Sequence, residues 1–244
     1  MPRDGSIAAA RQKTDRFAGP TALCGGQRRR PWPALALLTL LAACAAPPPG
    51  AKPVPSPVPA EGNCLDRLKV YDMDYKPVAD GGSAACPIRD AVEVTRVGQA
   101  KLSRPAVMTC ALAEQLSAFE GIFVQPAAAR TLGSPVTTIH HYGTYACRRA
   151  TGKASRMSEH AKANAIDIGI FETAKGDKVS VARHWNGRDA YAEFLKQVGQ
   201  GACTLFTGVL GPDSDSAHRD HFHFDMGPWA FCQLNPVDPR KLRK

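Results

Sequence analysis

The sequence predicts an α+β domain built on a mostly antiparallel sheet with flanking helices, and three observations support this class. Strand-like and helix-like segments are mixed along the chain without a regular βαβ rhythm, which argues against a parallel α/β fold. The 181 residues from Cys64 to Lys244 are enough to bury one core and too few to argue for two domains. Six cysteines lie in this region, and they predict a fold stapled by disulfides.

The N-terminal segment predicts a secretion signal. Arg28, Arg29 and Arg30 precede an apolar run at residues 34–43, which has the length of a signal h-region and is short for a membrane-spanning helix. The run closes on Leu-Ala-Ala-Cys44, which resembles the bacterial lipobox, whose cysteine is lipidated and becomes the first residue of the mature chain. We therefore expect removal of residues 1–43. A short buried helix is the weaker alternative, because the basic flank, the apolar core and the small residues before Cys44 all indicate a signal peptide.

Residues 44–63 predict a semi-rigid spacer. Seven of the nineteen residues after Cys44 are proline, and this density favours an extended polyproline conformation. The spacer would hold the domain of residues 64–244 off a membrane to which the lipid on Cys44 anchors it. Ala45 stands where an aspartate would hint at inner-membrane retention, so likeness to known lipoproteins implies the outer membrane, with the domain facing the periplasm.

The charge of the chain gives little support to a nucleic-acid partner. Residues 1–44 contain seven Lys/Arg and two Asp/Glu, so five of the nine formal positive charges lie there and four remain for the rest. No Lys/Arg run interleaved with aromatic residues follows, and we expect no nucleic-acid binding. A mildly basic surface would suit an anionic cell-wall polymer, although ordinary solvated charge is the simpler explanation.

Cysteine usage agrees with export. The six cysteines of residues 64–244 include no C-x-x-C pair, and in an oxidising periplasm an even number predicts three disulfides. Fifteen pairings are open to six cysteines. Nearness in sequence alone suggests Cys64–Cys86, Cys110–Cys147 and Cys203–Cys232.

The hydrophobic pattern places elements around the polar motifs. Apolar residues of Val107–Phe119 recur at helical spacing, and Pro126 should bar extension of that helix. The β-branched and aromatic residues 136–145 predict a strand, and the alternation over Ala165–Phe171 predicts another. A second helix is expected at 189–198 and a last strand at His221–Asp225.

Two motifs supply the chemistry. The first is Ser158-x-His160-x6-Asp167 and the second is His218-x-x-His221-x-His223. Two imidazoles and a carboxylate suit one catalytic Zn²⁺, with further imidazoles left for proton transfer. The turn or loop that carries His160 leads into the strand that carries Asp167, so both side chains can reach one ion.

The last predicted strand should hold its ligands rigidly. Side chains alternate along a strand, so His221, His223 and Asp225 should share one face while Phe222 and Phe224 point into the core. Ligands backed by buried aromatic rings have little freedom. An open three-ligand zinc site, which keeps its fourth position for water, needs this rigidity.

These residues resemble known families. The first motif is similar to the S-x-H-x-x-G-x-A-x-D motif of the zinc D-alanyl-D-alanine peptidases, and the second to the closing motif of the penicillin-insensitive murein endopeptidases. Both belong to the LAS-type metallopeptidases, which share a fold with the zinc domain of hedgehog proteins. Over residues 64–235, including Gly143-Thr-Tyr-Ala-Cys-Arg148 and the cysteine spacing, the chain most resembles the bacterial extensin-like C-terminal family.

The resemblance implies a role for each position. His160, Asp167 and His223 would bind one zinc ion per chain. His221 would be the general base, His218 a proton or charge partner, and Arg148 would stabilise negative charge on the substrate. Ser158 would hydrogen-bond within the ligand loop, and Ala163 stands where many of the peptidases have glycine. Asp225 is either a partner that orients a ligand histidine or a strand-end charge.

Two functions of different class follow. A zinc-dependent amide hydrolase would cut stem peptides or cross-links of peptidoglycan, a substrate implied by family and location. The alternative is a non-catalytic module, containing zinc, that binds or organises the cell wall. The extra imidazoles of His218 and His221 favour the enzyme, since a structural site is more often closed by a fourth protein ligand. We expect His140, His141 and the His184-Trp185 pair to be structural.

Overall fold

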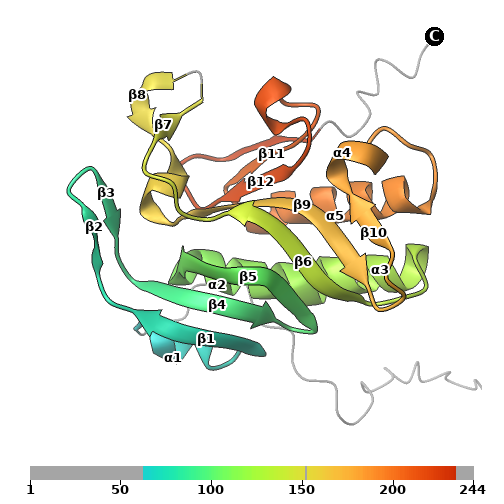
Figure 1. The fold of residues 1–244 in the computed structure, drawn as a ribbon, viewed down its shortest axis with the longest axis horizontal. Helices are drawn as coiled ribbons and strands as arrows, with labels where there is room; N and C mark the ends of the chain where they lie inside the picture. Colours follow the sequence, from blue (N-terminus) through green and yellow to red (C-terminus); the bar gives the residue numbers. More distant parts are fainter. Residues whose placement is uncertain (1–62, 152, 235–244) are drawn as a thin grey trace, which may run out of the picture. The chain divides into compact units, whose positions relative to one another are not determined.

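A computed structural model describes residues 63–151 and 153–234. The expected signal peptide, Cys44 and most of the proline-rich spacer lie outside the described residues. Figure 1 shows a large sheet with helices packed along one face. The nine-stranded sheet has the order β1-β4-β5-β6-β9-β12-β11-β13, and β10 pairs with residues 170–172 of β9.

The sheet is largely antiparallel, as the sequence predicts, with parallel pairing only between β5 and β6 and between β11 and β13. Its strands are β1 Met73–Val78, β4 Ala91–Val97, β5 Ala100–Thr109, β6 Val136–Gly143, β9 Ala165–Thr173, β10 Lys178–Ser180, β11 Gly208–Leu210, β12 Phe222–Asp225 and β13 Phe231–Gln233. Two small hairpins stand apart from it: β2 Gly81–Ser83 with β3 Cys86–Ile88, and β7 Arg149–Ala150 with β8 Lys153–Met157.

The helices are α1 Cys64–Leu68, α2 Cys110–Phe119, α3 Gln125–Thr131, α4 Val181–His184 and α5 Ala190–Leu205. A π-helical turn, η1, spans Glu120–Val124, and short 3₁₀ turns occur at η2 Glu159–Lys162 and η3 Ser216–His218. Helix α5 contacts both α2 and α3 behind the sheet (Figure 1). Within the described residues, none of these helices is long and apolar enough to span a membrane.

The first predicted helix starts later and runs further than expected. Residues 107–109 end β5, and Thr109 caps α2 because its hydroxyl accepts the Leu112 N–H. The expectation that Pro126 bars extension is wrong. Pro126 lies in the first turn of α3, and the π-helical turn joins α2 to α3.

The other predicted elements are confirmed with shifted ends. The strand expected over 136–145 ends at Gly143, and the strand expected over 165–171 continues to Thr173. The helix expected at 189–198 continues to Leu205, and Asp189 caps it by accepting the Ala192 N–H.

The core lies between the sheet and the helices. Phe222 and Phe224 of β12 are fully buried, as the alternation predicts. The Phe224 ring meets the Phe119 ring of α2 edge-on at 5.3 Å, and the Phe222 ring meets Trp185 at 5.4 Å. Since neighbouring side chains of a strand point to opposite faces, His223 projects to the face of the sheet away from the helices.

Three disulfides staple the domain, and two of the expected pairings are wrong. The structure joins Cys64 to Cys110 and Cys86 to Cys147, where nearness in sequence suggested Cys64–Cys86 and Cys110–Cys147. Cys64 and Cys110 are the first residues of α1 and α2, which pack together, so tertiary packing overrides sequence distance. The expected Cys203–Cys232 bond is present and ties α5 to β13.

Candidate metal centre

Three side chains from separate segments converge on one point. Strands β9 and β12 pair so that Asp167 lies directly opposite His223, and the Nδ1 atom of His223 lies 2.9 Å from Oδ1 of Asp167. The Nε2 atom of His160, from η2, lies 3.1 Å from that oxygen and 3.1 Å from His223 Nδ1. One ligand atom of each residue therefore faces the same small volume.

The turn η2 brings His160 to this volume. Ser158 caps the turn, and its hydroxyl accepts the His160 N–H at 3.3 Å, as expected for a contact within the ligand loop. The turn closes at Ala163, which is fully buried and has a left-handed backbone with φ of 55°. A side chain in this backbone conformation costs about 1 kcal/mol.

The outer nitrogens of both imidazoles are held by the protein. His160 Nδ1 lies 3.2 Å from the backbone oxygen of Thr144, and His223 Nε2 lies 3.0 Å from Oδ2 of Asp225. Asp225 thus contacts the candidate ligand His223 and is not a free charge at the end of the strand. Gly208, opposite Asp225 on β11, leaves room for this carboxylate, which a Cβ at position 208 would overlap.

The electrostatics of the cluster favour a cation. Burial lowers the pKa of His223, but the hydrogen bonds and charges of Asp167 and Asp225 outweigh it and raise that pKa to about 9. Burial by itself would raise the pKa of Asp167, yet its bonds to His160 and His223 hold the pKa well below the ordinary value. The site therefore stabilises a carboxylate beside a positive charge, which an imidazolium supplies here.

The donor set fits zinc. Two imidazole nitrogens and one carboxylate oxygen form a common catalytic zinc set, and tetrahedral ligands about 2.0–2.1 Å from the ion lie roughly 3.3 Å apart. The three ligand atoms are 2.9–3.1 Å apart, close to this spacing. A backbone carbonyl and a carboxylate on the outer nitrogens are the usual partners of metal-binding imidazoles.

Two further histidines flank the cluster. The Nε2 atom of His221 lies 3.5 Å from Oδ1 of Asp167, and its Nδ1 lies 2.9 Å from Oδ1 of Asp220. His218 Nδ1 lies 2.8 Å from Oδ1 of Asp215, and the rings of His218 and His221 have centroids 5.3 Å apart. Burial lowers the pKa of His218, an effect that Asp215 partly offsets. A carboxylate thus contacts Nδ1 of each ring, and Nε2 of His221 faces Asp167.

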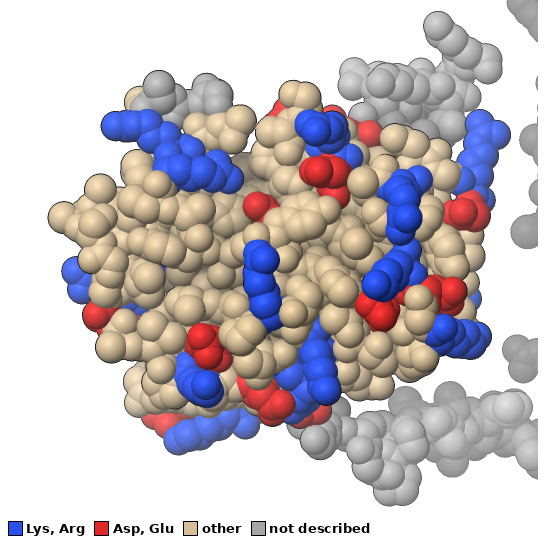
Figure 2. All heavy atoms as spheres, viewed as in Figure 1, with Lys and Arg blue, Asp and Glu red and all other residues tan. Residues whose placement is uncertain are grey.

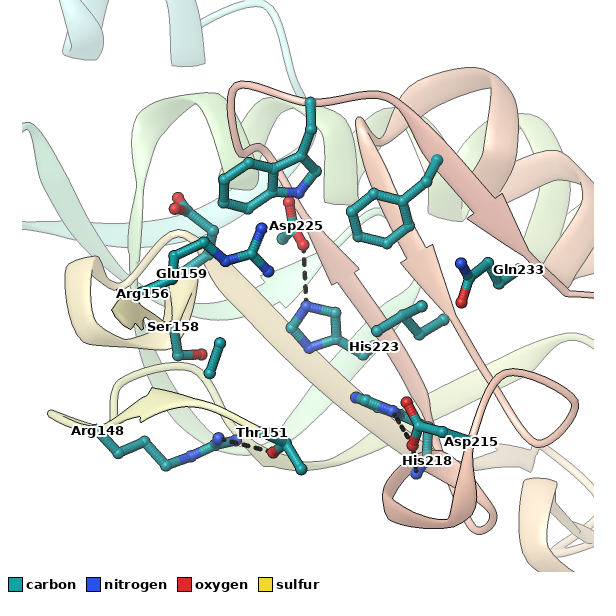
Figure 3. Close-up of a pocket in the computed structure, with 14 residues that line it drawn as sticks. Arg148, Thr151, Arg156, Ser158, Glu159, Asp215, His218, His223, Asp225 and Gln233 are labelled. Atoms are coloured by element: carbon teal, nitrogen blue, oxygen red, sulfur yellow. Dashed lines mark hydrogen bonds and ion pairs between the residues drawn. The ribbon is translucent and has the colours of Figure 1, made fainter. Parts of the chain in front are cut away.

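A cavity of about 240 Å³ adjoins the cluster (Figure 3). His218 and His223 line it on one side, and Arg148, just before β7, and Arg156, within β8, line it on the other. The Arg148 guanidinium lies 3.5 Å from the Thr151 hydroxyl. The structure thus brings Arg148 to the cavity, while His160, Asp167 and His221 are not among the residues that line it.

The remaining histidines lie outside the site. His140 Nε2 contacts Glu172 at 2.7 Å, and His141 Nε2 contacts the backbone oxygen of Arg104 at 3.0 Å. His184 Nδ1 accepts the Ser180 N–H at 3.0 Å, next to the buried Trp185. These contacts agree with structural roles.

Sequence reasoning missed four groups around the site. Asp220 and Asp215 orient the flanking histidines, and their places one and three residues before a histidine are a usable signal. The carbonyl of Thr144 and the stacking of Arg156 over Trp229 depend on tertiary contacts and leave no pattern in the sequence.

Comparison with known proteins gave one family model that matches most of the chain. The family model described as "Extensin-like protein C-terminus" matches residues 62–233, which span every described element of the fold. Searches of curated proteins and of solved structures gave no match.

Proposed function

The chain belongs to the extensin-like protein C-terminus family, and we propose that it is a zinc-dependent amide hydrolase acting on peptidoglycan in the cell envelope. One observation carries this proposal: three ligand atoms, from His160, Asp167 and His223, converge beside the unused imidazoles of His221 and His218. A cluster with three ligands and neighbouring acid–base groups is the arrangement of a catalytic zinc site.

When bound, zinc would polarise an amide carbonyl and make water acidic enough to be a nucleophile near neutral pH. The protein would supply the proton transfers. Asp220 holds Nδ1 of His221, so Nε2 of the same ring faces the ligand cluster and can take a proton from water. The same nitrogen would then give that proton to the leaving amine, and His218 would act beside it as a charge partner.

Arg148 would stabilise the negative charge that develops on the carbonyl oxygen. Its side chain lines the cavity that His223 also lines. A well-placed donor of this kind contributes on the order of 10²–10³ in rate. The two motifs resemble those of the LAS-type metallopeptidases. This resemblance supports the role of Arg148 and a peptide amide as the bond that is cut.

The substrate and location are part of the same proposal. Three disulfides support an oxidising compartment. The lipobox-like sequence before Cys44 supports a lipid anchor in the outer membrane, and the proline-rich spacer would let the domain reach the wall from there. Peptidoglycan is the abundant source of peptide amides at that place.

Metal analysis and a wall-digestion assay test the proposal together. The purified protein should contain one zinc per chain, and it should release new amino groups from purified peptidoglycan until a chelator removes the metal. His221→Ala should keep the zinc and lower the rate by about 10²–10⁴. His140→Gln is the matched control, because His140 pairs with Glu172 on the same sheet and lies outside the cluster.

The outcomes separate the two classes of function. Protein that holds zinc but leaves the wall intact, with or without chelator, would support the binding or scaffolding module. Loss of zinc in His221→Ala would mean that His221 closes the fourth coordination position, as in a structural site.

A further inference from the structure

We propose that the cavity beside the ligand cluster binds a carboxylate of a peptide substrate through the guanidinium group of Arg156, with Arg148 adding positive charge to the same cavity. The inference rests on the proposed function in taking this cavity as the substrate site. It adds the chemical class of the substrate, a peptide with a negative charge near the amide to be cut.

The first step is a balance of charge within the cavity wall. Each acidic residue that lines the cavity already has a partner: Asp225 contacts His223 at 3.0 Å, Asp215 contacts His218 at 2.8 Å, and Glu159 contacts the Lys162 ammonium at 3.0 Å. Each of these carboxylates thus contacts a group other than Arg148 and Arg156.

The arginines have no such partner. Among the described side chains, no carboxylate forms an ion pair with Arg148 or Arg156, although both line the cavity. The contacts of Arg148 are the neutral oxygens of Arg149 and Thr151, at 3.4 and 3.5 Å. Figure 2 shows basic side chains gathered over β7 and β8. Two positive charges in one cavity favour an anion.

The second step is the orientation of Arg156. Its guanidinium carbon lies 4.0 Å from the centre of the Trp229 ring, in a cation–π contact. Stacking fixes the plane of the guanidinium and leaves its edge donors free, and Figure 3 shows the Arg156 head pointing into the cavity. A planar fork held in this way matches the two oxygens of a carboxylate.

The third step is the character of the remaining wall. Trp229, Phe231 and Leu210 supply apolar surface next to the arginines. A small aliphatic side chain beside a carboxylate would satisfy both kinds of surface, as in the last residue of a peptide. A simple inorganic anion would leave the apolar surface unused.

A binding experiment tests this inference without relying on catalysis. Zinc-free protein is titrated, by NMR, with N-acetylated trialanine as the free acid and as the C-terminal amide, each in all-L and all-D form. At least one free acid should bind about tenfold or more tightly than its amide. Arg156→Gln should abolish this preference, Arg156→Lys should restore part of it, and Trp229→Leu should weaken it.

Arg149→Gln is the matched control, because Arg149 is exposed on the same hairpin and does not line the cavity. Three results would each overturn the proposal: equal affinity for acid and amide, no saturable binding of any free acid, or an equal loss in the Arg149 variant. Inorganic phosphate that binds as tightly as the best acid would also overturn it, since the site would then be a general anion site. Acid-selective binding without wall digestion would leave this inference standing and reject the hydrolase.

Discussion

The Nε2 atom of His223 lies 3.0 Å from Oδ2 of Asp225, and both side chains are buried. This contact directs the other ring nitrogen, Nδ1, toward Asp167 across the β9–β12 pair. Asp225 is itself held, because its Oδ1 accepts the Gly227 N–H at 2.8 Å. The orientation of one candidate ligand thus depends on a carboxylate two residues further along the same strand.

Asp225→Asn should weaken zinc binding by about 10–100-fold, the usual effect of losing a partner behind a ligand histidine. Gly208→Ala should weaken it as well, because the new methyl group would displace the Asp225 carboxylate. Competition with a chromogenic chelator measures both affinities. The control is Glu193→Gln, an exposed carboxylate on α5. Unchanged zinc affinity in Asp225→Asn would contradict the orienting role.

Zinc binding should release protons and strengthen as pH rises. The pKa of His223 is raised from 6.5 to about 9, so at neutral pH this imidazole must lose a proton before Nδ1 can bind an ion. Affinity should therefore rise by up to about tenfold per pH unit between pH 6.5 and 9, then level off. Calorimetry in buffers of different ionisation enthalpy would count the protons released, and a count of zero at pH 7 would disprove the expectation.

The stability of the zinc-free protein should show the opposite trend over the same range. A raised pKa for His223 means that its ion pair contributes fully below pH 6.5 and is lost as pH approaches 9. A lowered pKa for Asp167 means that its contribution is present above pH 3.8 and fades only in stronger acid. Denaturant titrations should thus give maximal stability of the zinc-free form between about pH 3.8 and 6.5. A maximum near pH 9 would refute this expectation.

Substitution at Ala163 should reveal the left-handed backbone of the ligand turn. Ala163→Gly relieves the conformational cost but loses a buried methyl group and adds chain entropy, so the free energy of unfolding should change by less than about 1 kcal/mol. Ala163→Val adds a β-branched side chain at positive φ in a buried site and should cost about 2–4 kcal/mol. Urea unfolding compares the two, and equal stability of the variants would argue against this backbone conformation.

The disulfide pairing can be read chemically. Proteolysis without reductant should give linked peptides for Cys64–Cys110, Cys86–Cys147 and Cys203–Cys232. Replacing both members of the Cys86–Cys147 pair by serine should lower stability by about 2–5 kcal/mol, because that bond closes a loop of 61 residues. Mass spectrometry identifies the linked peptides, and a fragment joining Cys64 to Cys86 would contradict the structure.

The sequence by itself determined the class of the fold and the segments that carry the candidate ligands. Strict alternation around Phe222 and Phe224 places His223 on the face away from the core, since the period of a strand is two whatever lies around it. Alternation also predicted β9, and a helical pattern predicted the greater part of α5. The N-terminal strands β1 and β4 were not predicted, although Val92 and Val94 of β4 alternate with Glu93 and Thr95 in a pattern that favours a strand.

Only the tertiary structure decided which distant groups meet. Register between β9 and β12 sets Asp167 opposite His223, and packing of α1 on α2 sets the partner of Cys64. The carbonyl of Thr144 and the stacking of Arg156 on Trp229 also arise from contacts between separate segments. A sequence pattern records how each residue relates to its neighbours along the chain, whereas these contacts depend on the three-dimensional packing of whole elements.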